Sequence, residues 1–408
     1  MPPEEPPVMS PASVPPPQRV LSRRSALCLG LLGVPALAGL TTPSHAWGAP
    51  ERPSGRGHVR YEDLYRPGDD LQQVADRVTG NQILTLPPGL FTVRDFRQGY
   101  YDGVRLGEGG ATGCRGIVGS GPSTVISVEA DTSTRDRGDN FAGNQLALGG
   151  VRAGVLSNFT LKGHSQNDRI YGGIVVNASP GAELSWLVLK GASRGYSNHP
   201  PGETFGINVL NSPRVTIRDT EVDGRNDFGT PVGASPIGWN NTTDAFLYRT
   251  YCHDGKAGML TFYEVTNVYT EDYRCFGTSS GSGDLSGHGI NHEQSQGTIT
   301  HVRPSLFVNG AYSGAAGASA STGMHVNLAN TRTDVPDVFI VEPSWDPGPG
   351  STGMLAVNIP DGYEVAGAGN KVATPPRVTK NGIVLSRSDH PHQGFGDRDP
   401  ARFFSLIH

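Results

Sequence analysis

A single unit recurs along the middle of the chain, and it constrains the fold more than any other feature. Each copy starts with a small residue, continues as a short run of alternating apolar and polar residues, and meets a turn before a second alternating run. Alternation with a period of two is typical of β-strands. Repetition at about 20–50 residues indicates a stacked coil. Seven copies begin at Gly173, Gly206, Pro236, Gly258, Gly289, Gly323 and Gly353.

The spacing of the copies predicts a coil of three strands per turn. The first apolar positions are Ile174, Ile207, Ile237, Met259, Ile290, Met324 and Met354, separated by 33, 30, 22, 31, 34 and 30 residues. Three strands of about five residues with their corners need no more than the shortest interval. The extra residues of the longer intervals are predicted as loops at 192–204, 225–235, 278–287, 311–322 and 343–352. Each loop comes just before the repeated strand, so all should emerge at one corner and border an elongated groove.

Two stretches resemble a known superfamily. The unit at 206–217 (GINVLNSPRVTI) and the opening at 84–89 (LTLPPG) are similar to those of the pectin-lyase-like superfamily of right-handed β-helices, over roughly residues 80–365. The resemblance implies the architecture and an extracellular carbohydrate ligand. The superfamily contains polysaccharide lyases, glycoside hydrolases, pectin esterases and phage tailspike proteins, so the reaction stays open.

We therefore predict an all-β chain, a right-handed parallel β-helix over residues 67–370 with a short N-terminal capping helix. Asp69 or Asp70 would cap that helix, which runs from Leu71 towards Gly80. A helix there would cover the open end of the stack, which otherwise exposes unpaired backbone groups. Residues 47–66 are predicted as a linker and 371–408 as a C-terminal cap or tail.

The first 46 residues predict export. Arg23 and Arg24 precede an uncharged apolar run at 26–40, and Ser44 and Ala46 fit the −3 and −1 positions of a cleavage site. This pattern is typical of a twin-arginine signal, which exports folded proteins. The run has 15 residues, fewer than the ~20 that span a bilayer, and none of that length follows. We expect a secreted protein with no membrane contact after signal cleavage.

Charge and cysteine content narrow the partners. The chain has 33 basic and 38 acidic residues; without the three arginines and two glutamates of residues 1–46, the net charge is −6. A nucleic-acid ligand is not expected, because phosphate binding generally shows as a basic excess. Cys252 and Cys275 lie about one repeat apart and are predicted to stack as buried thiols or to form a bridge. No third Cys or His accompanies them at ligand spacing, so no metal site is predicted.

A pair of short motifs resembles those of polygalacturonases. Residues 241–244 (NTTD) and 287–289 (GHG) are similar to that family's Asn-Thr-Asp and Gly-His-Gly motifs. The first motif closes a strand here whereas the second opens one, and the paired aspartates expected between them are missing. We interpret Asp244 as a corner residue and retain only His288.

Alternation supplies the candidate site. If Ile290 faces the core, Asn291 and Glu293 face the groove, whereas His292 shares the phase of Ile290 and is predicted to be buried. Residues before and within the neighbouring repeats should converge with Glu293 on two or three successive turns. The catalytic candidates are Glu293, His288, Asp254, Asp284 and His325. The substrate-binding candidates are Lys256, Asn291, Asn327, Tyr263, Tyr312 and Trp345.

These candidates leave two reactions on a polysaccharide open, with hydrolysis slightly favoured. A glycoside hydrolase needs two carboxyls ~5–9.5 Å apart, which Glu293 with Asp254 or Asp284 would supply. A lyase needs a base for the proton α to a uronate carboxylate, which His288 or His325 would supply, with stabilising polar groups. No cofactor is expected, and calcium would enter only for a lyase. The alternative from another class is a non-catalytic glycan-binding or tailspike-like adhesion protein.

Overall fold

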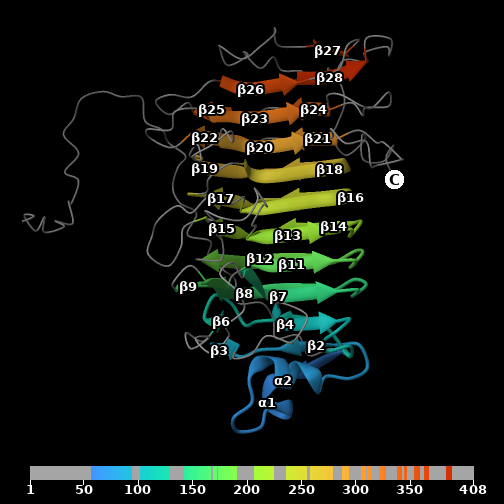
Figure 1. The fold of residues 1–408 in the computed structure, drawn as a ribbon, viewed down its shortest axis with the longest axis vertical. Coiled ribbons are helices and arrows are strands. Elements are labelled where there is room, and N and C mark those ends of the chain that lie inside the picture. The colour runs from blue at the N-terminus through green and yellow to red at the C-terminus, as the bar shows by residue number, and fades with distance from the viewer. Residues whose placement is uncertain are drawn as a thin grey trace, which may run out of the picture. The chain divides into compact units, whose positions relative to one another are not determined.

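The structure is a computed structural model, and its described residues form one curled sheet of 28 strands with two short helices. They are 57–93, 102–128, 142–166, 169–171, 173–190, 206–224, 236–254, 258–278, 287–293, 305–308, 310–314, 321–327, 338–341, 344–346, 353–358, 363–366 and 383–387. All belong to the compact unit Trp47–His408. Figure 1 shows the strands stacked as rungs, which is the right-handed parallel β-helix predicted from the repeat together with the resemblance.

Each full turn contributes one rung to each of three parallel faces. The first face consists of β4 (Asp102–Gly107), β7 (Ala142–Gly149), β11 (Ile174–Asn177), β13 (Ile207–Leu210), the first halves of β16 (Ile237–Tyr248) and β18 (Gly258–Glu271), β20 (Gly287–Glu293), β23 (Ser321–Asn327) and β26 (Gly353–Asn358). The second consists of β2 (Gln82–Thr85), β5 (Cys114–Val118), the first halves of β8 (Val155–Lys162) and β12 (Glu183–Lys190), β14 (Val215–Arg218), the second halves of β16 and β18, β21 (Ser305–Val308) and β24 (Val338–Val341).

The third face follows the second along the chain and leads back to the first. It consists of β3 (Gly89–Val93), β6 (Thr124–Val128), the second halves of β8 and β12, β15 (Glu221–Asp223), β17 (Tyr251–His253), β19 (Arg274–Thr278), β22 (Ala311–Gly314) and β25 (Ser344–Asp346). The longer predicted loops all fall between the third face and the next strand of the first face. Two of the predicted loops are too long. The range 311–322 contains the third-face strand β22, and 343–352 contains the third-face strand β25.

The register corrects the predicted phase at two repeats. Ile237 is aligned with Leu260, and Leu260 with Ile290, so the intervals there are 23 and 30 residues. The aligned positions are therefore Leu260 and Leu355, each one residue later than the predicted Met259 and Met354. The alternation of buried residues decides this phase, because Leu260 and Phe262 are both fully buried.

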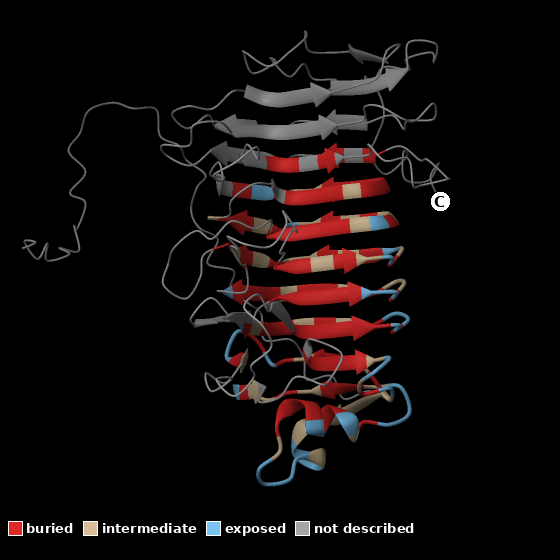
Figure 2. Ribbon diagram, in the orientation of Figure 1, coloured by how far each residue is buried: buried red, intermediate tan, exposed pale blue. Residues whose placement is uncertain are grey.

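The core is a stack of inward-facing side chains contributed at every rung (Figure 2). Trp239 and Phe262, on adjacent rungs, stack with ring centroids 5.2 Å apart. The next position in that column is His292, which is fully buried and packs edge-on to Phe262 and Phe307 at 6.1 and 5.7 Å. The prediction that His292 is buried is confirmed.

Corner residues stack as regularly as the strands do. Asn211 and Asn241 both adopt left-handed backbone, with φ of 47° and 48°, a conformation that asparagine tolerates better than most residues. Asn241 Nδ2 donates to Asn211 Oδ1 at 3.0 Å, and Asn211 Nδ2 to Asn177 Oδ1 at 3.4 Å. The asparagine amides thus form a ladder along the helix axis. Asp244 is likewise a corner residue, with φ of 59°, and accepts a hydrogen bond from Asn267.

The cysteines stack without a bridge. Cys252 is the register partner of Cys275, both side chains are buried, and both are free thiols. Of the two alternatives open from the sequence, stacking as small buried groups holds in the structure.

The N-terminal end carries the predicted cap. Helix α2 (Leu71–Asp76) is shorter than predicted, and Asp70 caps it through a reciprocal capping box with Gln73. It is preceded by β1 (His58–Arg60) and helix α1 (Tyr61–Leu64), which lie inside the region predicted as a linker. β1 extends the parallel ladder by pairing with β2, so the sheet starts earlier than the hydrophobic pattern indicated.

Antiparallel strands occur at two places among the described residues. β9 (His164–Gln166) and β10 (Arg169–Tyr171) form a hairpin, and β10 also pairs with β7. β28 (Ile383–Arg387), in the predicted C-terminal cap, pairs antiparallel with β24 and with β27 (Tyr363–Ala366). None of the helices in the described ranges is long and apolar enough to cross a membrane.

Buried His292 makes stability depend on pH. Burial lowers the pKa of His292 to about 3, whereas the unfolded chain takes up a proton near pH 6.5. Below that pH the unfolded state binds the proton and the folded state does not, so the fold loses stability as pH falls from 6.5 towards 3. The loss attributable to His292 between pH 7.5 and 5 is about 2 kcal/mol.

We expect an H292F variant to lack this component. Urea unfolding of both proteins at pH 7.5 and 5.0 measures it, and the wild-type protein should lose about 2 kcal/mol more than H292F over that interval. Equal losses in the two proteins would show that His292 accepts a proton in the folded state.

Candidate functional site

The outer side of the third face carries a cluster of ionisable side chains at its last positions. Val222, Cys252 and Cys275 face the core on successive rungs and are buried. Because neighbouring residues of a strand point to opposite sides, the residues that flank them face outwards. Asp223 and His253 are register partners on adjacent rungs. They therefore lie one strand spacing apart, ~4.8 Å between backbones.

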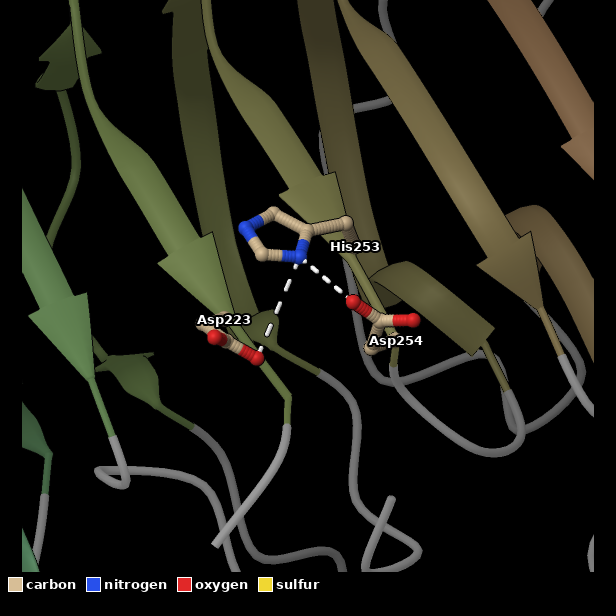
Figure 3. A group of neighbouring side chains, drawn as sticks. All are labelled: Asp223, His253 and Asp254. Atoms are coloured by element: carbon tan, nitrogen blue, oxygen red, sulfur yellow. Dashed lines mark hydrogen bonds and ion pairs between the residues drawn. The ribbon is translucent and has the colours of Figure 1, made fainter. Parts of the chain in front are cut away.

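His253 is held among three carboxylates. Its Nδ1 lies 2.8 Å from Oδ2 of Asp254 and 3.9 Å from Oδ1 of Asp223, and its Nε2 lies 3.4 Å from Oε1 of Glu221. Figure 3 shows both aspartates directed towards the same ring nitrogen. Asp254 follows β17 with left-handed backbone, φ 55°, and this turn lies where the chain leaves the third face for the first. On the other side, the ring of Tyr251 stacks on that of His253 at 4.8 Å.

The electrostatics of the cluster favour a proton on His253. Burial by itself lowers the pKa of His253, but the hydrogen bonds with Glu221 and Asp254 and the charges of Asp223 and Glu221 outweigh it and raise the pKa. The hydrogen bond with His253 lowers the pKa of Glu221 against the effect of its burial. The cluster thus contains an imidazole surrounded by carboxylates that stabilise its charged form.

The cluster can perform acid–base chemistry. A ring nitrogen of His253, one carboxylate oxygen of Asp223 and one of Asp254 all lie within 4.8 Å of one another. The same set offers ligands to a cation, which binds a deprotonated imidazole nitrogen. We interpret the cluster as an acid–base centre, because Nδ1 of His253 lies within hydrogen-bond distance of Asp254 and the two can exchange a proton.

The first face carries most of the remaining sequence candidates. The register aligns Tyr263 with Glu293 and Glu293 with Asn327, and it aligns Asn291 with His325 in the neighbouring column. The predicted stacking of these positions on successive rungs is thus confirmed for the backbone. Tyr263 is half-buried. The side chains of Glu293, Asn291, His325 and Asn327 lie outside the described set, so their roles stay predictions.

Glu293 lies far from the cluster along the strand. His288 is aligned with Gly258, near the start of the strand, whereas Glu293 is the last residue of β20. Five residues separate these positions, which corresponds to ~16 Å of extended chain. Asp254 comes before Gly258, the first residue of β18, whereas Glu293 is aligned with a position further along that strand. A Glu293–Asp254 pair within the ~5–9.5 Å needed for glycoside hydrolysis is therefore not supported.

The other predicted residues are not brought to the cluster by anything described. Lys256 and Asp284 lie outside the described residues, as does the side chain of His288. Tyr312 is aligned with the buried Cys275, and Trp345 with Tyr312. The side chains of both aromatics lie outside the described set, so their roles stay predictions.

Sequence reasoning included Asp254 but missed His253, Asp223 and Glu221. The signal was present in the cysteines. Once Cys252 and Cys275 are taken as stacked inward residues, alternation places His253 on the outer side. One rung earlier, Val222 is the register partner of Cys252, so Glu221 and Asp223, which flank Val222, also face outwards. The short third-face strand has only three residues at β15 and β17, too few for its period to be recognised without the register.

The chain is similar to several solved structures at low sequence identity. No family model matches the sequence, and no curated protein does. Among solved structures, a Yersinia enterocolitica family 28 exopolygalacturonase aligns at 14% identity and a TM-score of 0.41, covering 74% of this chain and 70% of its own. A tailspike protein of an E. coli bacteriophage aligns at 10% identity and a TM-score of 0.40, covering 74% and 65%.

A third similar structure is the A-module of a mannuronan C-5 epimerase from Azotobacter vinelandii. It aligns at 12% identity and a TM-score of 0.35, over 78% of this chain and 96% of its own. At these values neither residues nor activity transfer from the three proteins to this one, and the chain spans less than two thirds of the tailspike structure.

The pKa of His253 tests the cluster directly. We expect NMR titration of the wild-type protein to give a value above 6.5, the usual value for histidine, because Glu221 and Asp254 stabilise the imidazolium. A D254N variant should lower this pKa, since the amide cannot offer a charged acceptor to Nδ1.

An E183Q variant is the matched control for that titration. Glu183 also pairs with a cation, Arg218, but at the start of β12 on the second face. The E183Q substitution should leave the pKa of His253 unchanged. A His253 pKa at or below 6.5 in the wild-type protein would contradict the geometry of the cluster.

Proposed function

We propose that this chain is an exported enzyme that cleaves a polysaccharide, with its catalytic centre at Asp223, His253 and Asp254. The observation that carries the proposal is the meeting of two carboxylates and an imidazole within 4.8 Å. Two further features support it. The cluster lies on the outer side of the third face, and it lies where the third face leads into the first.

The distance between the carboxylates of Asp223 and Asp254 favours hydrolysis over elimination. Oxygens of Asp223 and Asp254 lie within 4.8 Å, which is near the ~5–5.5 Å separation of retaining glycosidases and below the ~6.5–9.5 Å of inverting ones. Asp223 is the less exposed, with 13% of its side chain accessible against 29% for Asp254. We assign Asp254 as the nucleophile, because His253 Nδ1 lies 2.8 Å from its carboxylate and orients it, and Asp223 as the acid.

In this mechanism the proton of Asp223 passes to the glycosidic oxygen as the bond to the anomeric carbon breaks. A carboxylate oxygen of Asp254 forms a bond to that carbon, and the leaving sugar departs with the proton. Asp223 then takes a proton from water, whose oxygen displaces Asp254 and releases the second sugar. His253 orients Asp254 through the 2.8 Å hydrogen bond and is a positioning residue.

Elimination is the second candidate, favoured by a different feature of the same cluster. Asp254 holds Nδ1 of His253, which is the arrangement that orients an imidazole so that Nε2 can take up a proton. In a uronate polymer, Nε2 of the neutral imidazole would remove the proton α to the carboxylate, the bond to the neighbouring sugar would break, and the leaving oxygen would take up a proton from water. The product carries a new double bond and absorbs in the ultraviolet.

Incubation with a panel of microbial and plant polysaccharides tests the proposal. Reducing ends without ultraviolet absorbance would identify hydrolysis, and the two signals together would identify elimination. We expect D223N and D254N to lower kcat about 10²–10⁴-fold without weakening ligand binding. The E183Q control should keep wild-type turnover. A protein that binds glycans but releases no product would be a non-catalytic glycan-binding or adhesion protein.

An E293Q variant separates the cluster from the site predicted at the end of β20. Because Glu293 lies at the far end of its strand, E293Q should alter KM more than kcat. Loss of turnover in E293Q together with full activity in D223N and D254N would place the catalytic centre on the first face instead.

Export by the twin-arginine route is part of the same proposal. In a bacterial host with that pathway, an R23K/R24K variant should remain inside the cell while the wild-type protein reaches the medium or periplasm, as measured by immunoblot of the fractions. Equal export of the two proteins would overturn this step and leave the catalytic proposal untouched.

A further inference from the structure

Glu221 lies beside Nε2 of His253, the ring nitrogen opposite the two aspartates. Figure 3 shows Asp223 and Asp254 both directed towards Nδ1, at 3.9 and 2.8 Å. Nε2 lies 3.4 Å from Oε1 of Glu221. Glu221 reaches this nitrogen from the neighbouring rung, because its register partner is Tyr251, two residues before His253 on the same outer side. Carboxylates of this chain therefore occupy both ring nitrogens.

The hydrogen-bond partners of the ring determine where its protons lie. An ionised carboxylate can only accept a hydrogen bond, so a ring nitrogen that faces one has to donate. The hydrogen bond with His253 lowers the pKa of Glu221 and outweighs the effect of burial, and the charge of Lys190 acts in the same direction. With Asp254 at Nδ1 and Glu221 at Nε2, both nitrogens donate. A ring in that state has no lone pair with which to remove a proton from a substrate.

The ring is also fixed in its orientation. Tyr251 stacks on it with ring centroids 4.8 Å apart and an angle of 24° between the rings. Only 10% of the His253 side chain is exposed. A ring that is held at both nitrogens, stacked on one face and buried to this extent keeps one orientation. A substrate carbon that is to lose its proton to Nε2 would therefore have to displace the carboxylate of Glu221.

We infer that Glu221 selects the reaction of the cluster: it occupies Nε2 of His253 and thereby blocks elimination, which leaves hydrolysis by the two aspartates. Glu221 acts through His253 and is a positioning residue that determines reaction specificity. The inference rests on the proposed function. It adds the side chain that separates the two candidate reactions.

Without the carboxylate of Glu221, elimination becomes accessible to the same residues. A neutral His253 that donates from Nδ1 to Asp254 has its lone pair on Nε2. In a uronate polymer, the proton α to the carboxylate would pass to Nε2. The electron pair of that C–H bond would form the new double bond as the bond to the glycosidic oxygen breaks, and this oxygen would take a proton from water.

An E221M variant tests the inference, because methionine keeps the length of the side chain and removes its charge and its acceptor atoms. The matched control is E183M. The side chain of Glu183 is 42% exposed and that of Glu221 is 43% exposed, and each lies against a basic side chain, Arg218 or His253. Both variants should keep the wild-type Tm, since both carboxylates are partly exposed.

NMR titration measures the effect of E221M on the ring. The substitution should lower the pKa of His253, because burial is then opposed only by the remaining acidic partners. At neutral pH it should also lower the fraction of rings that carry a proton on Nε2, as read from the chemical shifts of the ring nitrogens. E183M should leave both quantities at their wild-type values. Equal pKa values of His253 in E221M and wild-type protein would overturn the inference.

Product analysis measures the effect of E221M on the reaction. Alginate and polygalacturonate are the probes, because elimination needs the acidic proton α to a uronate carboxylate. Wild-type and E183M proteins should release reducing ends without ultraviolet absorbance, whereas E221M should form at least about tenfold more absorbing product than the wild-type background. An absorbing product from the wild-type protein, or none from an E221M protein that still cleaves these polymers, would contradict the role assigned to Glu221.

The two measurements separate this inference from the proposal on which it rests. Elimination by the wild-type protein would refute the role of Glu221 and keep the enzyme. A changed titration in E221M, with no cleavage of any polysaccharide by the wild-type protein, would keep the contact of Glu221 with the ring and refute the enzyme. If the wild-type protein cleaves neutral polysaccharides alone, the titration decides.

Discussion

In-register pairing of parallel strands is the constraint on which the rest of this structure depends. When each rung hydrogen-bonds to the next without slipping, one position in every turn faces the core and its neighbour faces solvent. The inward positions then build the column that contains Trp239, Phe262 and His292. The outward positions align Lys190, Asp223 and His253 on the third face. A slip of one residue at any rung would bury Asp223 or His253 and expose Val222 or Cys252.

The sequence was sufficient for the architecture because the architecture is periodic. Seven copies of one unit fix the coil, and the alternation inside them fixes which side of the first face is buried. The N-terminal start of the sheet was harder to predict from the sequence. β1 has only three residues and no partner in the repeat pattern, so nothing in its own sequence distinguishes it from a linker. The phase at Met259 also could not be settled locally, since Met259 and Leu260 are both apolar and only pairing with Ile237 and Ile290 selects one.

The site was predicted in part, and the reason is again periodicity. On the first face the strands are long enough for alternation to be followed, and the predicted stacking of Glu293 with Asn327 and of Asn291 with His325 agrees with the register. On the third face the strands are short, and the residues that meet there come from β12, β15 and β17. Their proximity depends on intervals of about one turn between segments with little sequence in common. The contact of Asp254 with His253 depends further on a left-handed turn, which an Asp-Gly pair permits but does not require.

The central claim is that a glycan meets Asp223, His253 and Asp254 at the corner between the third and first faces. A crystal structure of the D254N protein with a bound oligosaccharide tests it most directly. The account predicts a ligand with a glycosidic oxygen within hydrogen-bond distance of Asp223. A ligand bound at the far end of β20 beside Glu293, or carboxylates of residues 221 and 223 separated from His253 by more than one rung, would contradict it.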